Sequence, residues 1–277
     1  MIFYADETWS PLNANPFSKD GTYGKAWSAF IYDDSIDYYS NILENAKVYT
    51  LRVSPKIDAS CERLKDFVSY EVSNNRNVII SATRSKREDI KTIINSISFE
   101  EAAAIRTSDP RWLVHSTTKE LWTNIKKTGA LLAPSELRKR RITVREIGLR
   151  ALLEPDDYSD YIMLDIPDGC GEIVVNSRQL GYVCTDPDVP YQPGVRLYFD
   201  AHRIIRDGIA VRDGLHILKV KGKLPLETYL VRAVMEELLP DCAWTPSLYT
   251  EKANQYFLEN VQEIQMKKPG LKQIQKS

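Results

Sequence analysis

The sequence has few of the residues from which metal sites and disulfide frameworks are built. Its 277 residues include four cysteines and three histidines, and no two cysteines form a C-x-x-C pair. A structural zinc site needs several such ligands at short spacing, and disulfide frameworks are typical of small secreted chains. We therefore expect no metal site, and free thiols in a reducing compartment.

Long hydrophobic runs are missing as well. No stretch approaches the roughly 20 apolar residues that cross a bilayer. The first residues, MIFYADETWS, lack the basic and apolar regions of a secretory signal. These absences predict a cytoplasmic protein with no membrane partner.

The chain has almost no excess charge. Its net charge is −1, so attraction to nucleic acid cannot come from the molecule as a whole and must come from a local patch. Apolar residues make up 43 % of the chain, which is enough to bury a core and argues against disorder. The length accommodates one large or two ordinary domains.

Residues 1–100 alternate between strand and helix patterns. Short apolar or alternating runs predict strands, apolar residues at helical spacing predict helices, and Ser85 with Glu88 forms a capping-box pattern at a helix start. The predicted strands are 1–5, 26–32, 47–53 and 78–82, and the predicted helices are 37–44, 61–72 and 85–97. This order predicts a separate small α/β accessory domain at 1–100.

A pair of carboxylates follows the first predicted strand of this domain. Asp6 and Glu7 come directly after it, and Asp33 and Asp34 follow the second strand. Carboxylates at strand ends hold magnesium in ribonuclease-H-like nucleases, which leaves a nuclease role open. A domain that grips the substrate or binds a partner is the other hypothesis.

From residue 112 the pattern changes to short strands separated by turns. The predicted strands are 112–116, 161–166, 172–176, 181–184, 195–199, 216–220 and 228–233, and the predicted helices are 118–127, 201–207 and 249–266. Strands dominate, so the second domain, 108–277, is predicted to be α+β with an antiparallel core and a C-terminal helix.

The most informative run is WLVHSTTKELWTNIKKTGALLAP, residues 112–134. A His-Ser-Thr triplet, His115 to Thr117, ends a strand and is followed by one amphipathic helix that a glycine, Gly129, terminates. This resembles the opening of ADP-ribosyltransferase domains, although Ser116 stands where that family usually has glycine. The resemblance implies that His115, Ser116 and Thr117 bind NAD, with His115 also catalytic.

A second run, GVRLYFDAHRIIRDGIAVRDGLHILKVKGKLPLETYLV, covers residues 194–231. Its strand, short helix, Asp-Gly step, Arg-Asp-Gly turn and final strand resemble the C-terminal part of the RNA 2′-phosphotransferases, one branch of the same superfamily. The resemblance implies a split-sheet ADP-ribosyltransferase-like core and an arginine near the turn that engages an RNA phosphate. By position that residue is Arg212.

Two catalytic arrangements of this family remain open. Other ADP-ribosyltransferases use a glutamate on the last strand to stabilise the oxocarbenium ion that forms when nicotinamide leaves, and Glu227 has the matching position. The phosphotransferases rely on arginines instead and carry an Arg-His pair in an N-terminal lobe. No such lobe is recognisable in residues 1–100, which argues against simple repair of spliced tRNA.

Further candidate residues lie between the two runs. The basic segment LRKRRITVREIGLR could hold the NAD pyrophosphate or the phosphates of an acceptor, or could be a solvated helix face. The candidates for phosphate or nucleic-acid binding are Arg138, Arg140, Arg141, Arg145 and Arg178. The candidates for stacking on nicotinamide are Tyr182 and Tyr198.

Together these features predict an enzyme that uses NAD as a substrate and transfers ADP-ribose to RNA or DNA, as a toxin or phage-defence effector. Such an effector implies a nucleic-acid acceptor and an antitoxin or chaperone partner. Three alternatives stay open: removal of an RNA 2′-phosphate, mono-ADP-ribosylation of protein, and a non-catalytic module that binds a nucleotide or a partner.

Overall fold

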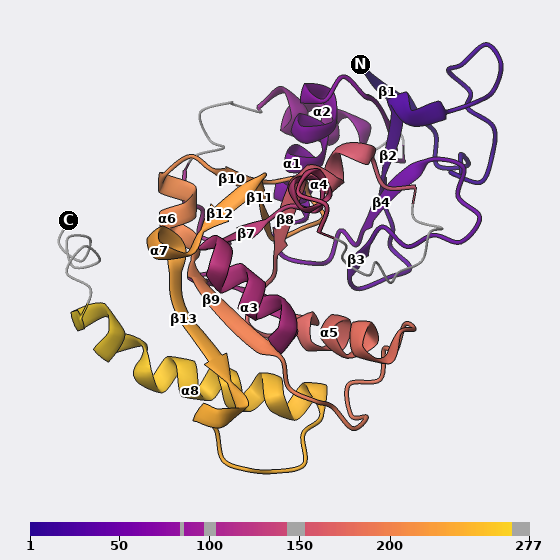
Figure 1. The fold of residues 1–277 in the computed structure, drawn as a ribbon. Helices are drawn as coiled ribbons and strands as arrows, with labels where there is room; N and C mark the ends of the chain where they lie inside the picture. Colours follow the sequence, from indigo (N-terminus) through magenta and orange to yellow (C-terminus); the bar gives the residue numbers. More distant parts are fainter. Residues whose placement is uncertain (84–85, 97–103, 143–152, 268–277) are drawn as a thin grey trace. The chain divides into compact units, whose positions relative to one another are not determined.

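The computed structural model describes residues 1–83, 86–96, 104–142 and 153–267, of which 262–267 are described by their backbone alone. The chain folds as two compact units. The first comprises Met1–Ala104, Leu149–Ser159 and Ala210–Lys219, and the second comprises Ile105–Gly148, Asp160–Ile209 and Val220–Ser277. Helices and strands mix in both, and the strands form several small sheets, so the fold is α+β (Figure 1).

A five-stranded sheet forms the centre of the first unit. Its order is β1-β5-β2-β4-β3, and all neighbours are parallel except β3, which is antiparallel to β4. The apolar residues of β4 and β5, together with Ala29 and Phe30 of β2, are buried, as expected for parallel strands covered on both faces. The strands are β1 (Ile2–Ala5), β2 (Trp27–Tyr32), β3 (Tyr39–Ser40), β4 (Tyr49–Val53) and β5 (Asn77–Ser81).

Two helices accompany this sheet, α1 (Ser60–Ser73) and α2 (Arg87–Asn95). Helix α1 buries Leu64, Phe67 and Val68, three of the four apolar positions that predict it in the sequence; the fourth, Val72, is exposed. The helix expected at 37–44 is wrong: this segment contains β3, in which Tyr39 pairs with Val53. Pairing with an existing strand outweighs a weak local helical pattern.

Polar and cation–ring contacts tie the two later segments of the chain into the first unit. The Arg76 guanidinium donates to Glu71 at 2.5 Å and to Asp157 at 2.8 Å. The buried Lys219 ammonium donates to Asp213 at 2.7 Å. Burial raises the pKa of Asp213, but the facing His216 and Lys219 outweigh it and hold the pKa well below its usual range. The Arg63 guanidinium of α1 donates to the carbonyl of Gly214 at 2.7 Å, and the Lys219 ammonium lies 3.5 Å from the centre of the Tyr70 ring. These two contacts link 210–219 to the rest of the first unit.

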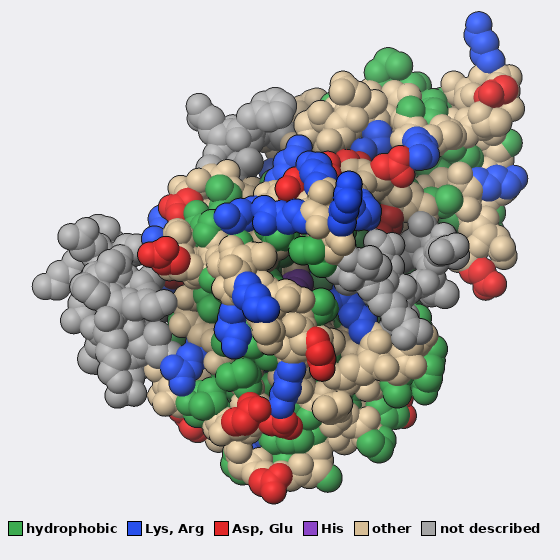
Figure 2. Space-filling model, viewed as in Figure 1, with side chains coloured by type: hydrophobic (Ala, Val, Ile, Leu, Met, Phe, Trp, Pro, Cys, Tyr) green, Lys and Arg blue, Asp and Glu red, His purple; other side chains and the backbone are tan. Residues whose placement is uncertain are grey.

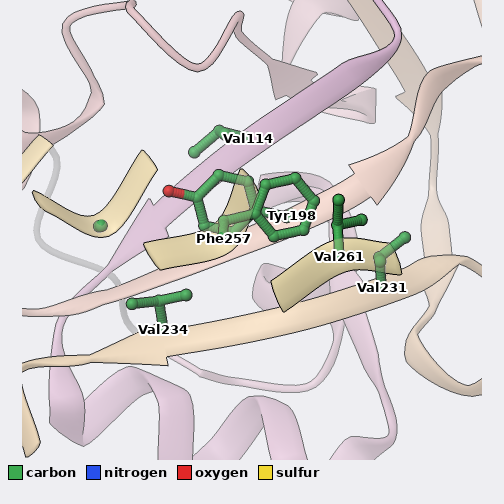
Figure 3. Close-up of a cluster of buried hydrophobic side chains, with 7 residues drawn as sticks. Val114, Tyr198, Val231, Val234, Phe257 and Val261 are labelled. Carbon is green, nitrogen blue, oxygen red and sulfur yellow. The ribbon is translucent and has the colours of Figure 1, made fainter. Parts of the chain in front are cut away.

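An antiparallel sheet, β13-β9-β6, lies at the centre of the second unit. Its strands are β6 (Trp112–Thr117), β9 (Val195–Asp200) and β13 (Leu230–Met235), and α8 (Pro246–Lys267) contacts β13 along one face (Figure 1). Tyr198 stacks on Phe257 of α8 with ring centroids 4.0 Å apart. Valines from β6, β13 and α8 complete this cluster (Figure 3).

Helix α3 (Lys119–Thr128) follows β6 as the sequence predicts. The Thr118 side chain accepts a hydrogen bond from the Leu121 amide, and Gly129 ends the helix with a φ of +65°. After it come β7 (Ala130–Leu132) and α4 (Pro134–Lys139), and β7 pairs with β12 (Lys223–Pro225).

Helix α5 (Gly171–Leu180) replaces one predicted strand, and a second predicted strand directly after it is not formed. The strand expected at 172–176 is wrong because this segment is helical, and none of the described residues 181–184 forms a strand. Val174 and Val175 favour strands, but one face of α5 packs on β6 and buries Val175. Tertiary packing therefore overrides the local preference. Gly181, with a φ of +84°, ends the helix.

The remaining elements are short. The strand expected at 228–233 begins later, because α7 (Leu226–Tyr229) precedes β13. The other elements of the described residues are β8 (Tyr161–Leu164), α6 (Ala201–Arg206), β10 (Ala210–Val211), β11 (Leu218–Lys221) and 3₁₀ turns at Gly24–Ala26, Asp156–Asp160 and Glu236–Leu238. Across the described part of the chain, no helix combines the length and apolarity needed to cross a membrane.

Candidate functional site

The second unit contains a cavity of about 600 Å³. Its lining comes from the end of β6, one face of α3, β7, α4, β8 and the last turns of α5. Most lining side chains are apolar, and a few polar ones converge among them. This composition is typical of small-molecule binding sites.

His115 lies in the lining and is partly exposed. Its Nδ1 is 3.3 Å from the carbonyl oxygen of Met163 in β8. Because a carbonyl can only accept, this bond places the proton on Nδ1 and leaves Nε2 of the neutral ring as an acceptor. Burial lowers the pKa of His115 to about 4; the Met163 bond opposes this, and the positive charge of Arg178 adds to it. The imidazole is therefore neutral at pH 7.

Arg178 of α5 also lines the cavity. Burial lowers the pKa of its guanidinium, and among the described residues no carboxylate forms an ion pair with it. A desolvated cation is costly unless an anion compensates it. Arg178 is therefore a side chain whose hydrogen-bonding capacity is available to an anionic ligand.

Two more of the predicted arginines lie at the cavity, Arg138 and Arg141, and both are exposed. They come from the last turn of α4 and the residue after its C-cap. Arg140, between them, is exposed and outside the lining. Arg145 lies outside the described residues. The structure thus brings Arg138, Arg141 and Arg178 together with His115.

The His-Ser-Thr triplet is divided between the two faces of β6. His115 and Thr117 line the cavity, whereas Ser116 faces the other way, as the alternation of a strand requires. The Ser116 hydroxyl donates to Glu172 at 2.5 Å. The buried guanidinium of Arg196 donates to the same Glu172 oxygen at 3.0 Å, and the Tyr191 hydroxyl donates to its other oxygen. Ser116 therefore belongs to a buried structural network.

The two predicted tyrosines are both outside the lining. Tyr198 is fully buried in the cluster around Phe257, and its hydroxyl donates to Asn254 at 2.8 Å. Tyr182 follows α5 and is 60 % exposed.

The remaining catalytic candidates are also outside the lining. Glu227 is an exposed residue in the first turn of α7. Arg212 belongs to the first unit, where its Nη2 donates to the carbonyl of Ala104 at 3.2 Å. The cavity is therefore lined by residues of the His-Ser-Thr motif, of the basic segment that begins in α4, and of α5. Arg212 is not part of this lining.

Sequence reasoning missed several polar residues of the lining, among them Asn124, Thr128 and Tyr161. Asn124 and Thr128 share one face of α3 with Leu121 and Ile125. A polar residue on the apolar face of a predicted helix is the sequence signal that indicates such a lining position. Tyr161 begins β8 and carries no comparable signal.

The chemistry of the site follows from its charges. The described lining contains three arginines and no carboxylate. No group of three or more metal-ligating side chains occurs among the residues that the structure describes. This arrangement can bind an anion through arginine forks and can accept a hydrogen bond at a neutral imidazole.

Comparison with known proteins adds no relative: no family model, curated protein or solved structure matches this chain.

Proposed function

We propose that this protein is an NAD-dependent transferase that attaches ADP-ribose to a nucleic acid, and that the cavity of the second unit is its NAD site. One observation carries the proposal: a neutral histidine and three arginines meet in one cavity. Arginine forks match the geometry of the pyrophosphate. A cavity of about 600 Å³ lies within the range of nucleotide and cofactor sites.

The proposed fold of the second unit is that of the ADP-ribosyltransferases. Support comes from the position of His115 and Thr117 at the end of β6, from α3 directly after them, and from the antiparallel order β13-β9-β6. In this arrangement Nε2 of His115 accepts a hydrogen bond from a hydroxyl of the nicotinamide ribose. Arg178 holds the pyrophosphate inside the cavity, and Arg138 and Arg141 hold phosphates at its edge.

The reaction breaks the bond between C1′ of the ribose and the nicotinamide nitrogen. The electron pair leaves with nicotinamide, which becomes neutral, and positive charge develops on the ribose ring. The acceptor then forms a bond to C1′: an ionised phosphate oxygen does so without losing a proton, and a hydroxyl or amine releases its proton to solvent. Binding the ribose hydroxyl at His115 and the pyrophosphate at Arg178 fixes C1′ for attack, and the apolar lining limits competing attack by water.

Incubation with labelled NAD and a panel of RNA and DNA oligonucleotides tests this proposal. We expect label on a nucleic acid, and a loss of at least a hundredfold in the His115→Ala variant. The matched control is His202→Ala, because His202 lies on α6 outside the cavity. Absence of transfer to any oligonucleotide, or equal activity of the two variants, would refute the proposal.

A second candidate is removal of an RNA 2′-phosphate. The absence of a carboxylate from the described lining favours it, because a phosphate nucleophile is already ionised and needs no general base. Release of ADP-ribose cyclic phosphate from a 2′-phosphorylated RNA would identify this activity. Label on polypeptide would instead indicate a protein ADP-ribosyltransferase, and failure to bind NAD in calorimetry would indicate a non-catalytic module.

The biological role that we propose is a toxin or phage-defence effector that acts in the cytoplasm and is held in check by an antitoxin or chaperone partner. We expect both the consumption of NAD and the modification of nucleic acid to stop growth. Induced expression should therefore arrest growth, and the His115→Ala variant should not. Normal growth with an active enzyme would contradict this role.

A further inference from the structure

A basic surface borders the cavity, and it is built from two segments that are distant in the sequence. One is the last turn of α4 and the residues after it, and the other is the turn between β11 and β12. We call this surface the basic edge; its members are Arg138, Lys139, Arg140, Arg141, Lys221 and Lys223. All six are exposed. Figure 2 shows Lys and Arg side chains gathered above a hollow in which a histidine is visible.

Backbone hydrogen bonds hold the two segments together. The amide of Ala133, the residue before α4, donates to the carbonyl of Gly222 at 2.8 Å. Lys223 pairs with Leu132 in the β7–β12 ribbon. These hydrogen bonds fix the backbone of Lys221 and Lys223 beside the start of α4, independently of the conformations of their side chains.

The β11–β12 turn also reaches the cavity itself. The Lys221 ammonium lies 5.9 Å from the centre of the Tyr161 ring, and Tyr161 is part of the lining. Leu132, the partner of Lys223, is part of the lining too. The basic edge is thus continuous with the site that contains Arg178.

Among the described residues, two carboxylates, Glu136 and Asp160, act by their charge on one of these cations, Lys139. Glu136 pairs with Lys139 at 2.7 Å on the surface of α4, where an ion pair contributes little. Neither Lys221 nor Lys223 has an ion pair among the described residues. A row of exposed cations is the electrostatic signature of a surface that follows a phosphate backbone.

We propose that the basic edge is the binding track for a single-stranded nucleic acid, and that Lys221 and Lys223 are phosphate-binding residues of this track. The proposal rests on the proposed function, because it identifies the acceptor as a strand. A strand is favoured over a duplex because the reacting nucleotide has to enter the cavity. A nucleotide in a duplex would first have to unpair and unstack, and this cost makes the duplex the weaker ligand.

Binding without NAD tests the track separately from the transferase reaction. The probe is a fluorescently labelled 12-nucleotide single strand, as RNA and as DNA, followed by anisotropy over a series of salt concentrations. In the Lys221→Gln/Lys223→Gln variant we expect binding about tenfold weaker at physiological salt. The slope of log affinity against log salt should fall by about 1.4, since each single-strand phosphate contact contributes about 0.7.

The matched control is Lys19→Gln/Lys25→Gln, which removes the same charge from exposed lysines of the first unit. We expect this variant to bind the strand as the wild type does, and both variants to bind NAD normally in calorimetry. An unchanged slope in the Lys221/Lys223 variant, an equal loss in the control, or a duplex bound as tightly as the strand would overturn the track. Normal strand binding without any NAD-dependent transfer would instead refute the proposed function and leave the track standing.

Discussion

The two faces of β6 handle polar groups in opposite ways. On one face, Ser116 joins Glu172 and Arg196 in a buried network where each charged group has partners of opposite sign or hydrogen-bonding character. On the other face, His115 is kept neutral, and Arg178 faces the cavity without a described carboxylate partner. Adjacent residues of one strand therefore serve two different purposes.

Polar groups on one face of β6 stabilise the fold, whereas those on the other face remain available to a ligand. A buried network contributes to folding only when its members satisfy one another. A buried polar group without a hydrogen-bonding partner lowers the stability of the fold. Such groups are retained at sites where a bound ligand supplies the missing partner. We therefore expect substitutions on the network face to change stability, and substitutions on the cavity face to change ligand binding.

The largest effect on stability should come from Glu172→Ala. This change leaves the fully buried guanidinium of Arg196 without its counterion, and breaking a buried pair costs about 3–5 kcal/mol. Urea denaturation measures the change in the free energy of unfolding. The matched control is Glu251→Ala on the surface of α8, which should change that free energy by less than about 0.5 kcal/mol. A loss below 1 kcal/mol for Glu172→Ala would contradict the stabilising role of the network.

Arg178→Gln, on the cavity side, should weaken ligand binding without lowering stability. Without the guanidinium, NAD binding should weaken by about ten- to a hundredfold, because a charged hydrogen bond contributes about 1.5–3 kcal/mol. The ligand-free protein should show a higher Tm, because a desolvated cation is removed. Calorimetry measures the affinity and scanning fluorimetry the Tm. Arg206→Gln, an exposed change on α6, should alter neither. Reduced stability together with unchanged NAD affinity would place Arg178 among the stabilising groups.

A pH titration of His115 tests the same comparison without a ligand. The pKa of about 4 in the folded state lies below the value of about 6.5 in the unfolded chain, so the unfolded state binds the proton more readily. The contribution of His115 to stability is therefore complete above pH 6.5 and is lost as the pH falls toward 4. Thermal unfolding between these values should depend less on pH in His115→Asn.

NMR of the imidazole resonances gives the corresponding direct measurement. In Arg178→Gln the pKa of His115 should rise, because a neighbouring positive charge is removed. It should remain below 6.5, because burial is the larger cause. A wild-type pKa near 6.5 would mean that the ring is solvated and that the cavity face is not desolvated.

Local sequence signals explain part of this site and miss the rest. Thr118 and Gly129 delimit α3, and a histidine at the end of the preceding strand points to the cavity. The two-residue period of β6 also carries enough information to separate Ser116 from His115 and Thr117. These features depend on neighbouring residues, so the sequence makes them predictable.

Long-range packing decides the rest. Helix α5 contradicts the strand preference of its valines, because it packs on β6 and its Glu172 pairs with Arg196, 24 residues further along the chain. Arg212 belongs to the first unit because the chain contributes residues 210–219 to that unit after most of the second unit has been formed from the preceding residues. No local sequence pattern reveals this assignment. Tyr198 resembles an exposed site aromatic in the sequence, but α8 covers it. Such partners are defined only when the chain has folded.

The smallest effect should come from Glu227→Gln. This substitution decides between the two catalytic arrangements considered above, one based on a glutamate and the other on arginines. The substitution keeps the length of the side chain and removes its charge. Because Glu227 is exposed on α7 and outside the cavity lining, we expect transferase activity within about twofold of the wild type and unchanged NAD affinity. Steady-state kinetics with labelled NAD separates kcat from KM. A loss of kcat of a hundredfold or more at constant KM would show that the carboxylate acts in the transition state, and the arginine-based site proposed here would then be incomplete.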